Sequence, residues 1–411
     1  MKKLLIFSLI FSLFLTGCTT PIASGNSETS NTSETIESTE TGITTDISEA
    51  PIVEDVDFKS NFNKNSHLID VLSENADNVV VSDFSINMAL SMALEGAEGN
   101  TQKELENYLN KTKEENLVYN KQLLEDVKNV RNIKLEVANS LWYNKTLEVK
   151  DTYKKILEEN YEAQIEDVDM QDPSTVGKIN KWCSDKTHEL IPEIINSTEN
   201  IESVLINALY FKANWLEEFY EGATKKEIFK GSKGDVEVDM MHSTESTYLE
   251  NEHAIGFIKH YFDGYAFVGI LPKNEGAFNL ADLDLEGLIN SKTYEYDVNI
   301  GLPKFKVEYE TSLVSALQQF GVKDAFIPKV ANFEGIAKDL FITDIIHKTY
   351  ISVDEIGTEA AAVTAITMDN AAFAPEQKQV KDVILDRPFA FAIIKTDNNN
   401  ILFSGKITNI E

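Results

Sequence analysis

Positive charge is scarce in this sequence. Its 411 residues include 37 Lys and Arg against 68 Asp and Glu, which gives a formal net charge of −31 at pH 7. A chain this acidic is repelled by nucleic-acid phosphates and by anionic lipid surfaces, so we expect neither as an electrostatic partner. The same charge disfavours an acidic partner and favours a basic one.

The sequence also lacks the motifs of common enzymes. It contains no Gly-x-Ser-x-Gly elbow, no P-loop and no Cys-x-x-Cys pair. His188 and Glu189 begin a HExxH pattern, but Pro192 stands where the second zinc-binding histidine is required. The six histidines are scattered. We therefore expect no enzyme, no catalytic residue, no cofactor and no metal.

The apolar run at the N-terminus, residues 4–15, is too short to span a bilayer comfortably. It follows the basic start Met1-Lys2-Lys3 and leads into Leu15-Thr16-Gly17-Cys18. This arrangement resembles a bacterial lipoprotein signal, which implies that residues 1–17 are removed and that Cys18 is lipidated. An ordinary signal peptide with a chance cysteine and a buried N-terminal strand are the alternatives.

Residues 18–54 have few large apolar side chains and many Ser, Thr and Glu. Such a segment cannot bury enough apolar surface to fold, so we interpret it as a disordered tether. The globular body would then cover residues 55–411. Lipid on Cys18 would hold this body on a bacterial membrane at the cell surface, or the body would be released outside the cell.

Cysteine is nearly absent from the body. Once Cys18 carries lipid, only Cys183 remains, so no internal disulfide can form. Cys183 ends the segment Asn180-Lys181-Trp182-Cys183, which has a helical pattern. We expect a buried structural thiol there rather than a nucleophile.

Strand and helix patterns mix along the body. Residues 133–143 alternate between apolar and polar, which indicates a strand, and residues 204–211 are apolar on both faces, as in a buried central strand. Residues 389–395 and 401–407 predict two further strands. Thr101 and Glu104 are spaced as a capping box that opens a helix. The body therefore reads as one α+β domain with large sheets.

Residues 353–365, VDEIGTEAAAVTA, resemble the proximal hinge of the serpin family. Six further stretches match that family in the same order along the chain. They are residues 78–101 (NVVVSDFSINMALSMALEGAEGNT), 206–219 (INALYFKANWLEEF), 238–241 (VDMM), 303–305 (PKF), 387–389 (RPF) and 403–406 (FSGK). Each motif alone is weak, but six in order across more than three hundred residues make a specific resemblance.

This resemblance implies the serpin fold, an α+β arrangement of helices around three β-sheets with an exposed reactive-centre loop, here residues 357–382. It also implies a suicide-type inhibitor of serine proteases. The protease forms a covalent acyl-enzyme on the loop, and the loop then inserts into the main sheet and traps it. We expect a monomer. A serpin-fold binding protein without inhibition is the alternative, and an ordinary solute-binding lipoprotein would instead have two lobes and no reactive loop.

The hinge matched by the resemblance has a composition that suits insertion. It comprises Glu355, Gly357, Thr358, Glu359, Ala360, Ala361 and Ala362. Proline would remove ladder donors, and residues 357–373 contain none. Alternate residues of a strand share a face, so Thr358, Ala360, Ala362, Thr364, Ile366 and Met368 would face the core, and none is charged. Gly357 is expected to give the pivot its conformational freedom.

Family spacing, counted from Glu355, places the cleaved bond between Ala371 and Ala372. The bonds between Met368 and Asp369 and between Phe373 and Ala374 remain alternatives. Residues 357–377 contain no Lys or Arg, so a trypsin-like protease has nothing to fill its acidic pocket. We expect elastase-like or subtilisin-like targets with a small apolar pocket, and Phe373 leaves chymotrypsin-like targets open.

The resemblance also assigns residues that control opening of the sheet. Ser82, Ser85, Asn207 and His347 match the shutter, where hydrogen bonds hold the central strands. Trp215 matches the breach, where insertion begins. Asp83 stands where the family usually has proline.

Overall fold

The computed structural model describes residues 61–358 and 378–411. The described residues all belong to one compact unit, Pro51–Glu411. The predicted signal peptide, Cys18 and the tether lie outside the described residues. None of the described helices has the length and apolarity that crossing a membrane requires.

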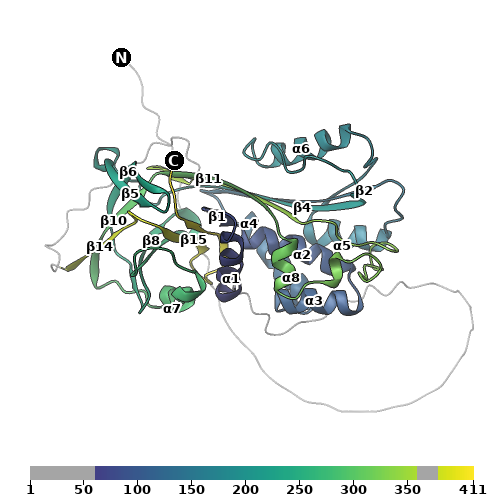
Figure 1. Ribbon diagram of the computed structural model, residues 1–411, viewed down its shortest axis with the longest axis horizontal. Helices are drawn as coiled ribbons and strands as arrows, with labels where there is room; N and C mark the ends of the chain where they lie inside the picture. Colours follow the sequence, from purple (N-terminus) through teal and green to yellow (C-terminus); the bar gives the residue numbers. More distant parts are fainter. Residues whose placement is uncertain (1–60, 359–377) are drawn as a thin grey trace, which may run out of the picture. The chain divides into compact units, whose positions relative to one another are not determined.

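Eight α-helices occur in the described part of the chain (Figure 1). They are α1 Phe62–Ser73, α2 Asp83–Gly96, α3 Gly99–Leu109, α4 Lys113–Lys128, α5 Asp151–Tyr161, α6 Ser174–Lys186, α7 Leu285–Asn290 and α8 Val314–Gln319. Short 3₁₀ turns lie at Glu221–Ala223, Phe262–Gly264, Ala281–Leu283 and Asp324–Phe326.

The main sheet has six strands in the order β11-β12-β13-β4-β2-β3. Their bounds are β11 Phe305–Ser312, β12 Ile346–Val353, β13 Gly357–Thr358, β4 Ser203–Asn214, β2 Lys134–Asn144 and β3 Gln164–Val168. The predicted strands at 133–143 and 204–211 correspond to β2 and β4. The described part of β13 has only two residues. It therefore pairs with β12 and β4 only at the ends of those strands.

Two further sheets complete the fold. One has the order β1-β16-β15-β9-β8-β7 and the other the order β14-β10-β6-β5. Their strands are β1 Val79–Val81, β16 Ile401–Ile407, β15 Phe389–Lys395, β9 Tyr265–Pro272, β8 Ala254–His260, β7 Tyr248–Glu250, β14 Gln379–Ile384, β10 Tyr296–Pro303, β6 Gly234–Glu245 and β5 Lys225–Gly231. The predicted architecture of helices around three sheets is confirmed, and the strands predicted at 389–395 and 401–407 have the bounds of β15 and β16.

The two faces of the main sheet pack against different helices (Figure 1). Buried α2 contacts β4 and β16, so it links the main sheet to the second sheet within one large core. α6 covers the opposite face of β2 and β4 over a smaller core that includes Trp142, Trp182 and Cys183. Cys183 is buried, as predicted, and burial raises the pKa of its thiol to about 12, so the thiol is not a nucleophile at neutral pH.

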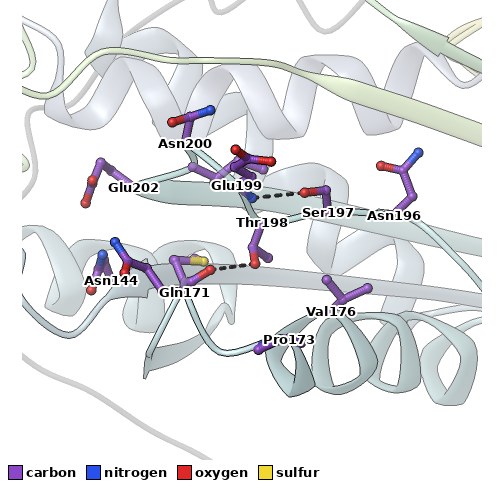
Figure 2. A pocket seen from close by; sticks show the side chains of 12 residues that line it. Asn144, Gln171, Pro173, Val176, Asn196, Ser197, Thr198, Glu199, Asn200 and Glu202 are labelled. Carbon is purple, nitrogen blue, oxygen red and sulfur yellow. Dashed lines mark hydrogen bonds between the residues drawn. The ribbon is translucent and has the colours of Figure 1, made fainter.

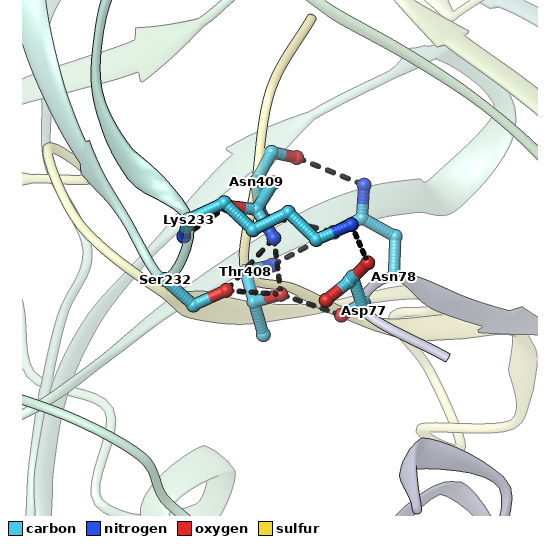
Figure 3. A network of polar contacts seen from close by, with 6 residues as sticks. All are labelled: Asp77, Asn78, Ser232, Lys233, Thr408 and Asn409. Atoms are coloured by element: carbon cyan, nitrogen blue, oxygen red, sulfur yellow. Dashed lines mark hydrogen bonds and ion pairs between the residues drawn. The ribbon is translucent and has the colours of Figure 1, made fainter. Parts of the chain in front are cut away.

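Polar side chains fasten the C-terminus to the body (Figure 3). The Asn78 side-chain oxygen accepts hydrogen bonds from the backbone N–H groups of Thr408 and Asn409, at 2.8 and 3.1 Å. Asn409 in turn accepts from the backbone N–H of Lys233, at 2.9 Å, in the turn between β5 and β6. This network joins the start of β1, the end of the chain and the β5–β6 hairpin.

The helix start predicted at Thr101 is wrong. α3 begins at Gly99, with Glu98 at its N-cap, so Thr101 does not cap the helix. The Thr101 hydroxyl is buried and accepts a hydrogen bond from the backbone N–H of Asn332 instead, at 3.0 Å. Of the reactive loop predicted at 357–382, residues 357–358 form β13 and β14 begins at Gln379, where it pairs with β10, whereas residues 359–377 lie outside the described residues.

Candidate functional site

Among the described residues, the main sheet has an open seam between β4 and β12. These neighbours of β13 form no backbone ladder with each other, although both strands are described throughout. β13 bridges them only at its two residues, where Gly357 pairs with Asn214 and Thr358 pairs with Ala213 and Val353. Below this bridge, the facing edges of β4 (203–212) and β12 (346–352) have no described strand partner. An unpaired strand edge is a template for another strand.

Gly357 is required by close packing. A Cβ atom at this position would lie 2.0 Å from the Ala213 carbonyl oxygen and 2.8 Å from the Asn214 Cα atom. The backbone of Gly357 is not in the left-handed region, so the predicted need for conformational freedom is not what selects glycine here. Glycine instead lets β13 approach β4 closely enough to pair with it.

Replacing Gly357 with alanine is expected to destabilise the protein by about 1–3 kcal/mol, because the methyl group overlaps the β4 backbone. Thermal or urea unfolding measures the loss. Gly177→Ala is the matched control, since no atom lies within 4 Å of a Cβ there and Gly177 lies within α6. That control should stabilise the protein by about 0.5–1 kcal/mol, and equal effects of the two variants would contradict the account.

Thr358 points into the core beneath the sheet. It is 2% exposed, and its hydroxyl shares a hydrogen bond with the hydroxyl of Tyr261. Tyr261 stacks on Trp215 with 4.3 Å between ring centres and 9° between planes. Thr358, the first residue of the predicted core-facing series, therefore faces the core. Trp215, the predicted breach residue, stacks on the tyrosine ring to which Thr358 is hydrogen-bonded.

The chain just before β13 is held in place by the segment that follows β4. The Trp215 indole N–H donates to the Asp354 carbonyl at 2.9 Å, and the Trp215 backbone N–H donates to the Ile356 carbonyl at 2.9 Å. Phe219 donates its backbone N–H to the Glu355 carbonyl at 2.9 Å. The backbone carbonyls of residues 354–356 are thus hydrogen-bonded to Trp215 and Phe219. These three residues, the entry to the seam, therefore have a defined conformation.

Glu355 anchors this entry through its side chain. Its carboxylate lies 2.7 Å from the Lys304 ammonium and accepts from the Thr224 hydroxyl at 2.9 Å. Burial acts to raise the pKa of the Glu355 carboxyl, but the hydrogen bonds outweigh it and hold that pKa below its usual value. Glu355 is therefore ionised at neutral pH and fixes the residue from which the hinge extends.

The predicted shutter residues Ser82, Ser85 and His347 come together under β12. The His347 Nε2 atom accepts a hydrogen bond from the Ser82 backbone N–H at 3.1 Å, and the Ser82 hydroxyl accepts from the Ser85 backbone N–H at 3.1 Å as the N-cap of α2. Nε2 can accept only in a neutral imidazole. Burial lowers the pKa of His347 to about 4, which is consistent with this neutral form.

Asn207, the fourth predicted shutter residue, has a different partner. Its side-chain N–H donates to the Asn139 side-chain oxygen at 2.7 Å, and Asn139 donates to the Tyr161 carbonyl at 2.6 Å. The Asn207 side-chain oxygen is buried and has no hydrogen-bond partner in the described structure. A buried acceptor without a donor is costly, so a donor brought to this atom would stabilise the protein.

Asp83 occupies the first position of α2, directly after its Ser82 cap. Proline suits this position because its missing N–H is not needed there. A carboxylate suits it for another reason, since the N-terminus of a helix carries partial positive charge. Asp83 also accepts from Asn87 within the first turns, at 3.0 Å. The departure from the family pattern is therefore compatible with the same local structure.

The remaining predicted site residues lie outside the described part of the chain. They are the hinge residues Glu359, Ala360, Ala361 and Ala362 and the candidate cleavage residues Met368, Asp369, Ala371, Ala372 and Phe373.

Sequence reasoning missed a buried ion pair behind the breach. Lys259 is 2% exposed, and its ammonium lies 2.6 Å from the Glu245 carboxylate and 4.3 Å from the centre of the Phe219 ring. The cation therefore supports the segment that binds residues 354–356. A lysine inside the apolar run of β8 was the only signal in the sequence, and it does not identify a partner.

A cavity of about 720 Å³ lies at the end of β4 opposite β13 (Figure 2). Loop residues 196–202, together with Asn144, Gln171 and residues near the start of α6, line it. Glu199 and Glu202 are its only ionisable side chains. In the described residues there is also no cluster of three or more His, Cys, Asp or Glu that would bind a metal.

Comparison with known proteins identifies this arrangement. The family model "Serpin (serine protease inhibitor)" matches residues 64–410. An uncharacterized serpin-like protein of Thermococcus kodakarensis is 32% identical across all of this chain and 99% of its own length. Human leukocyte elastase inhibitor is 32% identical over 82% of this chain and 95% of its own.

Solved structures agree with these relatives. The thermophilic serpin tengpin in its native state superimposes with a TM-score of 0.76 at 32% identity, over 86% of this chain and 96% of tengpin. The family model's range, residues 64–410, includes β4, β12 and β14. The chain belongs to the serpin family.

Proposed function

We propose that this serpin is a suicide-type inhibitor of serine proteases that traps an acyl-enzyme by inserting its reactive loop between β4 and β12. The open seam is the observation that carries the proposal. β13 is antiparallel to both of its neighbours, as a central strand of an antiparallel segment must be. Cleavage of the loop would free the chain after Thr358 to continue that strand.

The register of β13 sets the length of such an insertion. Gly357 lies opposite Asn214 and Thr358 opposite Ala213, so continuation in register would place residue 368 opposite Ser203, where β4 begins. Cleavage at or beyond residue 368 would therefore allow the strand to fill the whole seam. A bond between Ala371 and Ala372 meets this requirement and leaves little slack, which would otherwise let the protease complete deacylation.

The same register supports the inserted state chemically. Thr364 would lie opposite Asn207, on the core-facing side that Thr358 occupies. Its hydroxyl could donate to the Asn207 side-chain oxygen, which has no described donor. Insertion would then satisfy a buried acceptor as well as two unpaired strand edges, so the inserted form would be more stable.

The target class follows from the loop sequence and the charge. The absence of Lys and Arg in residues 357–377 and the alanine at 371 favour elastase-like or subtilisin-like proteases with a small apolar pocket. A net charge of −31 favours a cationic member of that group, because opposite charges accelerate encounter. We place this inhibitor, as a monomer, at the cell surface through lipid on Cys18.

A panel of elastase, subtilisin, chymotrypsin and trypsin tests the proposal on residues 51–411, the compact unit of the described residues. Elastase or subtilisin should give a band at the summed mass that survives boiling in detergent. The mass of the released C-terminal peptide should correspond to residues 372–411. Ala371→Arg is the matched control and should transfer inhibition to trypsin. Inhibition of trypsin alone by the unchanged protein would contradict the proposed target class.

A further inference from the structure

A second cavity, of about 570 Å³, lies away from the seam, where the end of α1, the β5–β6 turn, residues 275–278 and β16 meet. Its apolar lining includes Ala76, Phe278 and Pro388. One wall is polar and rigid, since Asp77, Ser232 and Thr408 belong to the network that fastens the C-terminus (Figure 3). The cavity is thus preformed, with an apolar side and a polar rim, as small-molecule sites are.

Cations outnumber free anions in this lining, although the chain as a whole is strongly acidic. Lys230, Arg387 and Lys406 all line the cavity. Lys230 and Arg387 share one carboxylate, that of Asp386, at 3.6 and 3.2 Å. The lining carboxylate of Asp77 is already paired with Lys233, which lies outside the cavity.

Lys406 has no carboxylate partner within the described residues. Its ammonium donates to the Phe278 carbonyl at 2.5 Å and lies 4.9 Å from the centre of the Phe278 ring. The carboxylate of Asp70 forms no ion pair with the Lys406 ammonium in the described structure. It accepts hydrogen bonds from the backbone N–H groups of Leu280 and Ala281 instead. Burial lowers the pKa of Lys406, with Asp70 opposing the shift. A bound anion would relieve this cost.

Arg387 also has a buried donor atom without a hydrogen-bond partner in the described structure. Its Nη2 donates to the Pro272 carbonyl at 2.9 Å, whereas its Nε is buried and has no partner among the described residues. Glu275 is the remaining anion of the lining and is exposed, so solvent screens it. The interior of the cavity therefore favours negative charge beside an apolar wall.

We propose that this cavity binds a small amphipathic anion, with a carboxylate or similar group at Lys406 and an apolar tail against Phe278 and Ala76. Neither loop insertion nor protease recognition requires this site, so the inference is independent of the proposed function. A ligand that binds the folded protein alone also raises its melting temperature.

Calorimetric titration of residues 51–411 with decanoate tests the site, with uncharged decan-1-ol as the matched probe. Decanoate should bind once per molecule with a dissociation constant of about 1 mM or tighter. Decanol should bind at least about tenfold more weakly, because it lacks the charge that Lys406 receives. The absence of saturable decanoate binding, or equal affinities for the two probes, would overturn the proposal.

Variants locate the site. Lys406→Met should weaken decanoate binding about tenfold or more, and Lys406→Arg should keep it within a few-fold, because the charge is retained. Lys103→Met removes an exposed charge on α3 and should change nothing. If Lys406→Met does not fold, Ala277→Trp serves instead, since Ala277 is exposed at the cavity and a bulky ring there should block entry. Undiminished binding by that variant would place the ligand elsewhere.

Discussion

Replacing Thr358 with arginine is expected to turn the protein from an inhibitor into a substrate. Thr358 is buried beneath the main sheet against Tyr261, as the second residue of β13, the strand that insertion would extend. An arginine there would leave the sheet, so insertion would first have to bury its charge. A buried charge without a partner costs about 3 kcal/mol or more, which is enough to slow insertion about a hundredfold. The protease would then deacylate before it is trapped, so the loop should be cleaved while protease activity persists.

The number of inhibitor molecules consumed per protease inactivated measures this change. Thr358→Ser is the matched control, because it keeps the hydroxyl that bonds to Tyr261 and adds no charge. The control should inhibit like the unchanged protein. Equal inhibition by Thr358→Arg would show that trapping does not depend on the buried position of this side chain.

Lowering the pH from 6.5 to 4 is expected to weaken the fold through His347. Burial lowers the pKa of this histidine to about 4 in the folded protein, against an ordinary value of 6.5. Between these values the unfolded chain binds a proton that the folded protein does not, so stability is complete above pH 6.5 and is lost as the pH falls. The loss amounts to about 3 kcal/mol by pH 4.

Urea unfolding at a series of pH values isolates this contribution when His347→Gln is compared with the unchanged protein. Glutamine can still accept from the Ser82 N–H but does not titrate, so the variant should lose less stability over this range. His253→Gln, which removes an exposed histidine, should follow the unchanged protein. Parallel curves for all three proteins would exclude His347 as the titrating group.

Local patterns in the sequence predicted the elements of this fold well. The strands β15 and β16 were predicted with their full bounds, because the polar turn of residues 396–400 separates them. The core-facing position of Thr358 also followed from alternation, since a strand has only two faces. The shutter contact between His347 and Ser82 came from the family resemblance rather than from any local pattern.

Contacts between residues far apart in the chain could not be predicted from the sequence. Asn207 bonds to Asn139, 68 positions away, and not to His347, because the pairing of β2 with β4 decides which side chains meet. Gly357 is needed for its approach to Ala213, which only the register of β13 on β4 reveals. The pairing of Lys259 with Glu245 likewise depends on how β8 and the end of β6 pack. The pattern of apolar residues along the sequence indicates whether a segment is a helix or a strand. It does not indicate which other segment that element packs against.

The melting temperature of residues 51–411 before and after cleavage of the loop tests the central claim most directly. If the freed chain enters the seam and pairs with β4 and β12, about fifteen new ladder hydrogen bonds should raise the melting temperature by at least about 10 °C. Cleavage anywhere in residues 368–377 suffices, so a non-target protease can be used. A melting temperature that stays the same or falls after cleavage would contradict insertion and leave the seam without the role proposed for it.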